Sequence, residues 1–255
     1  MTAADGGRRI RLDDFRHIAL DDTTSTNSEC LERARHGDHG NLWITAALQT
    51  GGRGRRGRAW VSEPGNLYAS LLLIDPAPLD KVHSLPLAVA VAVQEAVQAV
   101  MPQGTPPVMI KWPNDILIDR KKTCGILLEG ETLPDRRQAL VIGCGINIAH
   151  APDAAMYPIT SLRAYGSPVS PEELFAHLFR SMAGALALWD RGEGLPAIIE
   201  RWKAAAGGIG EKITVNLNDR SISGQFAGID DTGRLILDTG LGTKQLFAAG
   251  DVFFG

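Results

Sequence analysis

An arginine-rich stretch at residues 49–60 contains the residue types that bind an anion. It reads QTGGRGRRGRAW. Arginine supplies permanently charged, planar donors that match carboxylates and phosphates, and glycine lets the backbone approach a ligand closely. Trp60 adds a flat face on which a base could stack. These features predict an anion-binding loop. The spacing matches neither a GxxxxGK[ST] phosphate loop nor a GxGxxG dinucleotide turn.

The same stretch could instead be a basic segment of a nucleic-acid-binding protein. Arginine- and glycine-rich segments of that kind bind nucleic acids without a fixed fold, but this stretch is short and occurs once in the chain. Strand-like apolar runs flank it at residues 42–48 and 67–74. A loop placed between two strands favours a lid over a ligand.

A second group of reactive side chains lies within the sequence IKWPNDI. Residues 108–118 are expected to form one apolar strand that Pro113 interrupts, because proline cannot donate a ladder hydrogen bond. The interruption is consistent with a functional role for Lys111, Asn114 and Asp115. It is equally consistent with a bulge in which Asn114 and Asp115 bond to their own turn, or with a Lys111–Asp115 pair.

A lysine lies where the next turn enters a strand. The polar residues 119–122 and the strand-like residues 123–129 predict a hairpin. A turn lysine is more often a solvated surface charge than a catalytic group. Neighbouring side chains of a strand point to opposite faces, so Lys122 can face a pocket while Lys121 faces water.

Three small polar residues stand at a predicted helix start. Thr26 followed by Glu29 fits a capping box, and a helix is expected to continue through Arg35. Capping alone explains Ser25, Thr26 and Asn27. A helix N-terminus carrying such side chains would also suit a carboxylate or a ureido group.

A later strand, expected at residues 138–148, contains two glycines. Gly143 and Gly145 flank Cys144, and Asn147 follows. Glycines inside a strand suggest the close approach of a ligand or of another backbone.

Composition limits the function classes that are open to the chain. Its 255 residues are 44% apolar and 22% charged, with a formal net charge of −3, which argues against broad nucleic-acid binding. Residues 1–11 lack the apolar core of a signal peptide, and the longest apolar run, near 85–93, is too short to cross a membrane. The widely spaced cysteines indicate neither a disulfide framework nor a zinc site, and favour a reducing cytoplasm: Cys30, Cys124 and Cys144.

The periodicities predict an α+β chain. We expect a flexible tail at residues 1–14, a core with a mixed β-sheet and flanking helices at 15–207, and a small SH3-like β-barrel at 208–255. Helices of the core are expected at residues 85–101, 170–189 and 195–206, the second starting at the capping sequence SPEE.

Five stretches, in order, resemble the bacterial biotin–protein ligases (biotin–[acetyl-CoA-carboxylase] ligases). The resemblance covers most of residues 18–150, and the small C-terminal barrel also fits. Each motif alone is weak, but the five together are specific. They are Ser25-Thr26-Asn27, Gln49 with Gly52 to Gly57, Lys111-Trp112-Pro113-Asn114-Asp115, Lys122 with Gly125-Ile126-Leu127, and Gly145-Ile146-Asn147.

The resemblance implies a role for each matching residue. Those implied to contact biotin are Ser25, Thr26, Asn27, Gln49, Arg53, Gly54, Arg55 and Lys122. Those implied for ATP and the adenylate are Gly52, Arg53, Arg55, Trp60, Asn114 and Asn147. Those implied to act at the reaction centre are Arg55, Lys111, Asp115 and Lys122. Metal ligands are left unassigned.

The resemblance also implies the reaction. Biotin would react with ATP, with Mg²⁺ on the phosphates, to give biotinyl-5′-AMP, and a lysine of a biotin carboxyl carrier protein would then accept the biotin. Some family members carry an N-terminal helix-turn-helix domain. Only about seventeen residues precede the first expected strand here, too few for a three-helix DNA reader, so sequence-specific DNA binding is not implied.

Further expectations concern the partners and the alternatives. No membrane contact is expected, and a homodimer is compatible with the resemblance. A lipoate or octanoate ligase or transferase on a similar core is the alternative enzyme.

Overall fold

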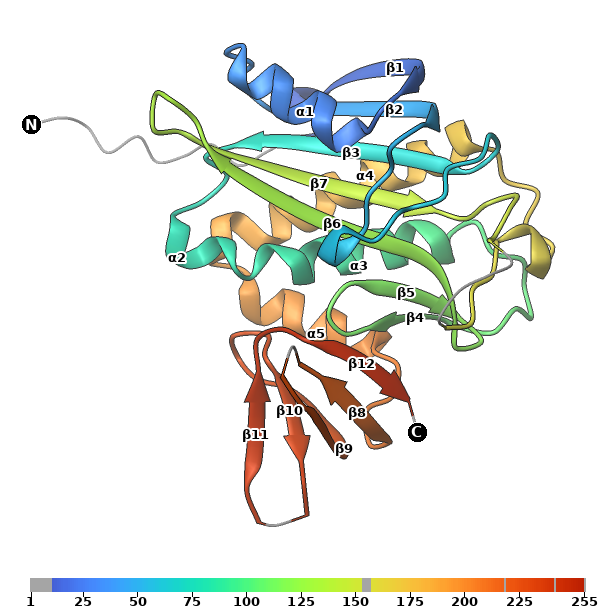
Figure 1. Cartoon of the computed structure of the whole chain (residues 1–255), viewed down its shortest axis with the longest axis vertical. Coiled ribbons are helices and arrows are strands. Elements are labelled where there is room, and N and C mark those ends of the chain that lie inside the picture. Colours follow the sequence, from blue (N-terminus) through green and yellow to red (C-terminus); the bar gives the residue numbers. More distant parts are fainter. Residues whose placement is uncertain (1–10, 153–156, 218, 241, 255) are drawn as a thin grey trace, which may run out of the picture.

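A seven-stranded mixed sheet forms the centre of the molecule (Figure 1). The computed structural model describes residues 11–152, 157–217, 219–240 and 242–254, so most of the expected tail at 1–14 lies outside the described residues. The strand order is β1-β2-β3-β7-β6-β5-β4. β1 and β2 are parallel and the other neighbours are antiparallel. The strands are β1 (Arg16–Thr23), β2 (Leu42–Gln49), β3 (Leu67–Ile74), β4 (Val108–Lys111), β5 (Asp115–Ile118), β6 (Lys121–Thr132) and β7 (Gln138–Ile146).

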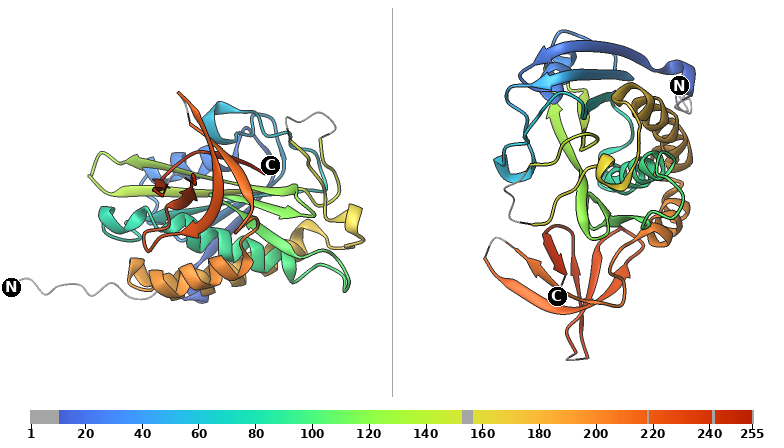
Figure 2. Two further views of the ribbon diagram at one scale, coloured as in Figure 1. Left: turned by 90° about the horizontal axis from the view of Figure 1, so that it is seen from below. Right: turned by 90° about the vertical axis from the view of Figure 1, so that its right-hand side faces the viewer.

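Helices cover both faces of this sheet (Figures 1 and 2). Alternate residues of a strand point to opposite faces, so Leu72 packs in one apolar cluster with Cys30 of α1, while Leu71 packs in another with α3 and α4. Burial on both faces explains why β3 is apolar along nearly its whole length. The helices are α1 (Thr26–Arg35), α2 (Leu79–Val82), α3 (Leu85–Gln98), α4 (Pro171–Trp189) and α5 (Leu195–Ala205).

Short 3₁₀ turns complete the helical elements: η1 (Leu12–Asp14), η2 (Arg55–Gly57), η3 (Arg163–Tyr165) and η4 (Asp190–Gly192). The predicted start of α4 is confirmed. The Ser170 hydroxyl accepts from the Glu173 backbone N–H at 3.2 Å, and the Glu173 carboxylate accepts from the Ser170 N–H at 2.9 Å. Within the described residues, no helix is long and apolar enough to span a bilayer.

The expectation of one interrupted strand at residues 108–118 is wrong. β4 and β5 are two antiparallel strands, and Lys111 lies opposite Asp115 across the hairpin. Pro113, after a cis peptide bond, belongs to the turn. A proline in the turn removes no ladder bond, so no bulge is needed.

A second, five-stranded antiparallel sheet follows α5, with the order β11-β10-β9-β8-β12. Its last two strands, β11 and β12, follow each other in sequence but lie at opposite edges of this sheet. The Trp112 indole N–H donates to the Gly233 carbonyl at 3.2 Å and ties the sheet to the β4–β5 hairpin. The strands are β8 (Lys212–Asn216), β9 (Ser221–Ile229), β10 (Leu235–Asp238), β11 (Lys244–Phe247) and β12 (Asp251–Phe254).

Candidate active site

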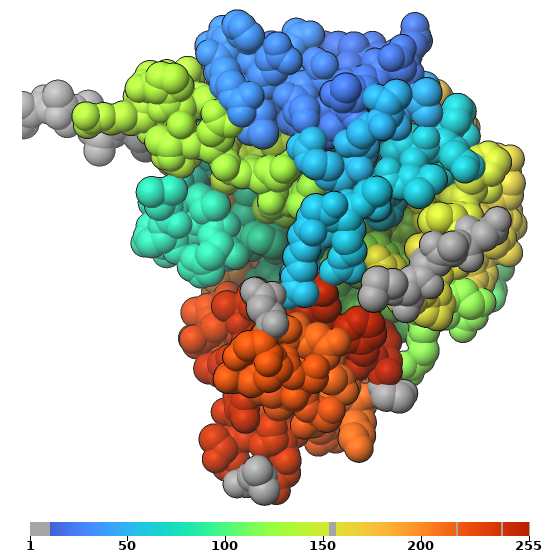
Figure 3. All heavy atoms as spheres, viewed as in Figure 1, coloured from blue at the N-terminus to red at the C-terminus, as the bar shows by residue number. Residues whose placement is uncertain are grey.

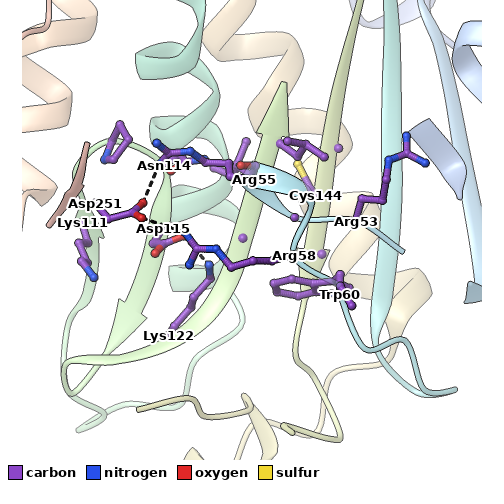
Figure 4. Close-up of a pocket in the computed structure, with 18 of the residues that line it drawn as sticks. Arg53, Arg55, Arg58, Trp60, Lys111, Asn114, Asp115, Lys122, Cys144 and Asp251 are labelled. Atoms are coloured by element: carbon purple, nitrogen blue, oxygen red, sulfur yellow. Dashed lines mark hydrogen bonds and ion pairs between the residues drawn. The ribbon is translucent and has the colours of Figure 1, made fainter. Parts of the chain in front are cut away.

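One pocket collects nearly all the side chains that the sequence singles out. It lies between the start of α1, the β4–β5 hairpin, strands β6 and β7, and β12 of the small sheet (Figure 4). The arginine-rich loop at residues 49–60, between β2 and β3, runs across it and reaches the C-terminal residues (Figure 3). The predicted residues that line it are Ser25, Thr26, Asn27, Gln49, Arg53, Gly54, Arg55, Trp60, Lys111, Asn114, Asp115 and Lys122.

Two predicted residues lie outside the set that lines the pocket. Asn147 is 2% exposed, and its amide donates to the Thr160 carbonyl at 3.2 Å, behind the pocket wall. Gly52 packs against the backbone of Trp60, where a Cβ atom would come within 2.6 Å of a carbonyl oxygen. Their contacts with a nucleotide stay predictions.

The start of α1 is capped by the side chain of Gln49, the last residue of strand β2. The Oε1 atom of Gln49 accepts from the Thr26 backbone N–H at 2.9 Å and from its hydroxyl at 3.2 Å. The predicted capping box is wrong: Ser25 is the N-cap and makes no side-chain cap bond, and Glu29 accepts from the Thr23 hydroxyl instead. Because Gln49 satisfies the helix end, the Ser25 side chain is free of capping and lines the pocket.

Asn27 belongs to a buried polar network that the sequence did not predict. The Ser70 hydroxyl lies 2.6 Å from its Oδ1 atom, and its amide donates to Glu129 at 2.7 Å. Glu129 also pairs with Arg53 at 3.2 Å. Glu129 lies four residues after Gly125 in β6 and therefore on the same face of the strand. An acidic residue on the face that carries the pocket-lining Gly125 was the signal available in the sequence.

Lys122 and Asp115 form an ion pair of 2.6 Å inside the pocket. The Lys122 side chain is 12% exposed, whereas that of Lys121 is 46% exposed and pairs with Asp119 at 3.4 Å. The predicted orientation of the two lysines is therefore confirmed. Burial acts to lower the pKa of Lys122, but Asp115 outweighs it and the pKa is raised, which keeps Lys122 charged.

Lys111 lies in a different environment. Its ammonium is 5.5–5.9 Å from the ring centroids of Tyr157, Phe253 and Phe254, a cation–π arrangement. Burial lowers its pKa, and the nearby positive charge of Lys122 adds to the effect. The expected alternative of a Lys111–Asp115 ion pair is not what the pocket contains, since the carboxylate of Asp115 binds Lys122.

Side chains of the protein approach the strand glycines. A Cβ atom on Gly145 would lie 2.5 Å from the Trp60 ring, and one on Gly125 would lie 2.7 Å from it. The indole therefore rests flat on the backbone of β6 and β7. Among the described residues, its buried N–H has no hydrogen-bond partner, so it is available to an acceptor in the pocket.

Comparisons with known proteins agree with this geometry. A model of the biotin/lipoate A/B protein ligase family matches residues 19–147, and a model of the biotin protein ligase C-terminal domain matches residues 208–255.

The biotin–[acetyl-CoA-carboxylase] ligase of Paracoccus denitrificans is 37% identical over 91% of this chain and 98% of its own. That of Mycobacterium tuberculosis is 31% identical over 90% and 85%. The biotin protein ligase of Aquifex aeolicus, solved with biotin and ATP, superposes with a TM-score of 0.79 at 26% identity, over 94% of this chain and 99% of that one. These matches show that the chain belongs to the biotin/lipoate A/B protein ligase family.

Proposed function

We propose that this protein is an ATP-dependent biotin–protein ligase, which activates biotin as biotinyl-5′-AMP and transfers it to a lysine of a biotin carboxyl carrier protein. One observation carries the proposal: a single pocket joins the polar groups at the start of α1 to the buried cations of the reaction centre. The near full-length match to ligases that are named for biotin favours biotin over lipoate or octanoate.

In the first half-reaction, a carboxylate oxygen of biotin bonds to the α-phosphorus of ATP and pyrophosphate leaves. Two anions must meet, so fixed positive charge is required. Lys122, held by Asp115 at 2.6 Å, would bind the biotin carboxylate. Arg55, whose guanidinium donates to Asn114 at 2.9 Å, would stabilise charge on the phosphoryl oxygens. Lys111 adds a third cation of the pocket.

In the second half-reaction, the acceptor lysine attacks the acyl carbon, AMP leaves, and the amine loses a proton. Asp115 is the carboxylate that we propose to orient the amine or accept the proton. The ureido ring of biotin would lie at Ser25, Thr26, Asn27 and Gln49, and the adenosine beside Trp60 with Asn114.

The Mg²⁺ ion of the reaction is better explained as bound to the phosphates of ATP than to a site made by protein side chains. In the described part of the chain no group of three or more His, Cys, Asp or Glu residues could hold a metal ion. Magnesium commonly binds through substrate phosphates and water with one or two carboxylates, so we propose that Mg²⁺ arrives with ATP. It would neutralise phosphate charge there.

The same proposal covers partners and location. Sequence-specific DNA binding is not expected, because the net charge is −3 and each loop arginine already lies within 4.0 Å of a carboxylate. The free, buried cysteines fit the reducing cytoplasm. β1 is an edge strand, through which two copies could pair as a homodimer.

A pyrophosphate-release assay tests the proposed function. Release should require both biotin and ATP, and a purified carrier domain should become labelled at one lysine. Octanoate and lipoate are tested in place of biotin as alternative substrates. Faster pyrophosphate release with either acid would overturn the assignment to biotin.

A further inference from the structure

Every arginine of the loop has a carboxylate partner, and the partners come from two different sheets. Arg53 pairs with Glu129 of the large sheet at 3.2 Å. The other three gather on a single carboxylate of the small sheet, Asp251, and Figure 4 shows this carboxylate together with Arg55 and Arg58. Their distances to it are 3.8 Å for Arg55, 2.9 Å for Arg56 and 2.8 Å for Arg58.

The three contacts with Asp251 are not equivalent. Arg56 and Arg58 both donate to the same oxygen, Oδ2. Arg55 instead directs one nitrogen to Asn114 at 2.9 Å and the other to the Gly250 carbonyl at 3.3 Å. Arg55 therefore points to the reaction centre through Asn114, while Arg56 and Arg58 bind the small sheet through Asp251.

Outside its ion pairs, the loop is held by the Trp60 ring on Gly125 and Gly145 and by the Arg53–Ser28 hydrogen bond of 2.9 Å. Its internal backbone bonds include Gly54 N–H to Arg58 at 2.7 Å and Trp60 N–H to Gly52 at 2.9 Å. Four guanidinium groups within six residues also repel one another. A carboxylate shared by three of them offsets this repulsion in the closed position.

We propose that Asp251 is a positioning residue that clamps the arginine loop closed over the pocket. The consequence of this clamp rests on the proposed function: the closed loop would shield the adenylate from water and from the amines of other proteins. Asp251 acts through Arg56 and Arg58, and those two arginines anchor the loop while Arg55 serves the substrate.

The expected effect is moderate. The Arg56 and Arg58 side chains are 42% and 41% exposed and Asp251 is 21% exposed, so each pair alone contributes little. Three pairs are lost together when the carboxylate is removed. Opening of the loop should then rise by about threefold to tenfold.

Hydrogen exchange measures this opening without any substrate. In Asp251→Asn, the backbone amides of Gly54 and Trp60 should exchange about threefold to tenfold faster than in the parent protein. Asp251→Glu should exchange more slowly than Asp251→Asn. Asp219→Asn is the matched control, because it removes the same charge from the small sheet, and its carboxylate is 69% exposed and pairs with the adjacent Arg220.

A double-mutant cycle separates the clamp from a general loosening of the small sheet. Arg56 is outside the set of described residues that line the pocket, so Arg56→Gln tests the anchor without altering that lining. If Arg56 and Asp251 act through one contact, the double variant should open less than the product of the two single effects. Simple multiplication of the two effects would contradict the clamp.

The ligase reaction supplies the second readout. Asp251→Asn should release more adenylate, seen as biotin on bystander lysines. If the parent protein shows no biotin-dependent pyrophosphate release, the proposed function fails and the exchange rates still decide the clamp. If the parent is active but exchange and bystander labelling in Asp251→Asn match the parent, the clamp is wrong and the function stands.

Discussion

At the residue scale, the pocket shifts the pKa values of its two lysines in opposite directions. Lys122 has a carboxylate partner at 2.6 Å and a raised pKa. Lys111 is surrounded by three aromatic rings, and burial lowers its pKa. One lysine is therefore fixed as a cation, and the other carries its charge at a cost to stability.

Lys122→Ala should damage adenylation. The substitution leaves Asp115 without its partner and removes the cation that we propose for the biotin carboxylate. A loss of about 3 kcal/mol, or roughly a hundredfold in kcat/KM, is expected for a charged hydrogen-bonded group. Single-turnover pyrophosphate release measures it.

Lys121→Ala is the internal control for that experiment. Lys121 is 46% exposed and pairs only with the neighbouring turn residue Asp119 among the ion pairs of the described chain, so adenylation should be nearly unchanged. For Lys122→Ala itself, transfer of biotin from pre-formed adenylate to the carrier protein should be slowed less than adenylation. Equal damage from both variants would mean that the site is not built around Lys122.

Lys111→Met should stabilise the fold at neutral pH, by on the order of 1 kcal/mol or ~2–4 °C in Tm. Because the pKa of Lys111 is lowered in the folded state, the unfolded chain binds the proton more tightly. The free energy of unfolding of the parent protein should therefore rise with pH between the lowered pKa and the ordinary lysine pKa.

The advantage of Lys111→Met should shrink over that same pH range, since neutral Lys111 no longer carries a buried charge. Thermal melts at a series of alkaline pH values would show this. A constant difference at all pH values would contradict it.

At the element scale, the loop and the central strands fit each other through Trp60. The indole lies on Gly125 and Gly145, where a Cβ atom would come within 2.7 and 2.5 Å of the ring. The glycines thus provide a flat surface for the closed loop rather than flexibility in the strands.

Gly145→Ala should displace Trp60 and weaken nucleotide binding, with an overpacking cost of about 1–3 kcal/mol. Isothermal titration with ATP would measure the loss. Gly130→Ala in β6 is the control, because its Cβ atom would meet the flexible end of Leu140 at 3.0 Å and the Ala139 carbonyl only at an ordinary contact distance of 3.7 Å.

A double variant identifies what occupies the space above Gly145. If the indole does, Trp60→Ala with Gly145→Ala should bind ATP no more weakly than Trp60→Ala alone. If the alanine still adds its full cost, the ligand itself needs the glycine.

The sequence predicted most of the elements because their signals are local. The capping sequence before α4 and the alternation that separates Lys121 from Lys122 depend on a few adjacent residues. The β4–β5 hairpin was missed because a proline turn inside an apolar run resembles an interrupted strand.

The missed parts of the site depend on contacts between distant segments. Gln49 caps α1 from another strand, Glu129 joins Asn27 to Arg53 across the sheet, and Asp251 reaches the loop from the end of the chain. No local pattern reports such pairings, since each residue alone is an ordinary polar side chain.

At the scale of the whole molecule, the two sheets share one apolar core. Phe226 of the small sheet belongs to the same cluster of buried residues as Ile110 and Leu87 of the large domain. Arg120 also pairs with Glu211 at 2.7 Å across the junction. We expect the described parts of both sheets to unfold together.

Phe226→Ala should therefore lower the stability of the entire molecule. Phe226 is 1% exposed, and its truncation should cost about 3–5 kcal/mol. Calorimetry should show one transition at a lower Tm. Leu246→Ala, 46% exposed on β11, should change it little. Two separate transitions in the Phe226 variant would contradict a shared core.

The pocket wall contains a thiol, and its chemistry bears on self-damage. Cys144 lines the pocket and is 3% exposed. An acyl adenylate is an acylating reagent, and a thiolate beside it would form a thioester. Burial raises the pKa of Cys144 to about 12, which leaves well under roughly one molecule in ten thousand as thiolate near neutral pH. The same burial that encloses a reactive intermediate thus keeps the enzyme from acylating its own wall.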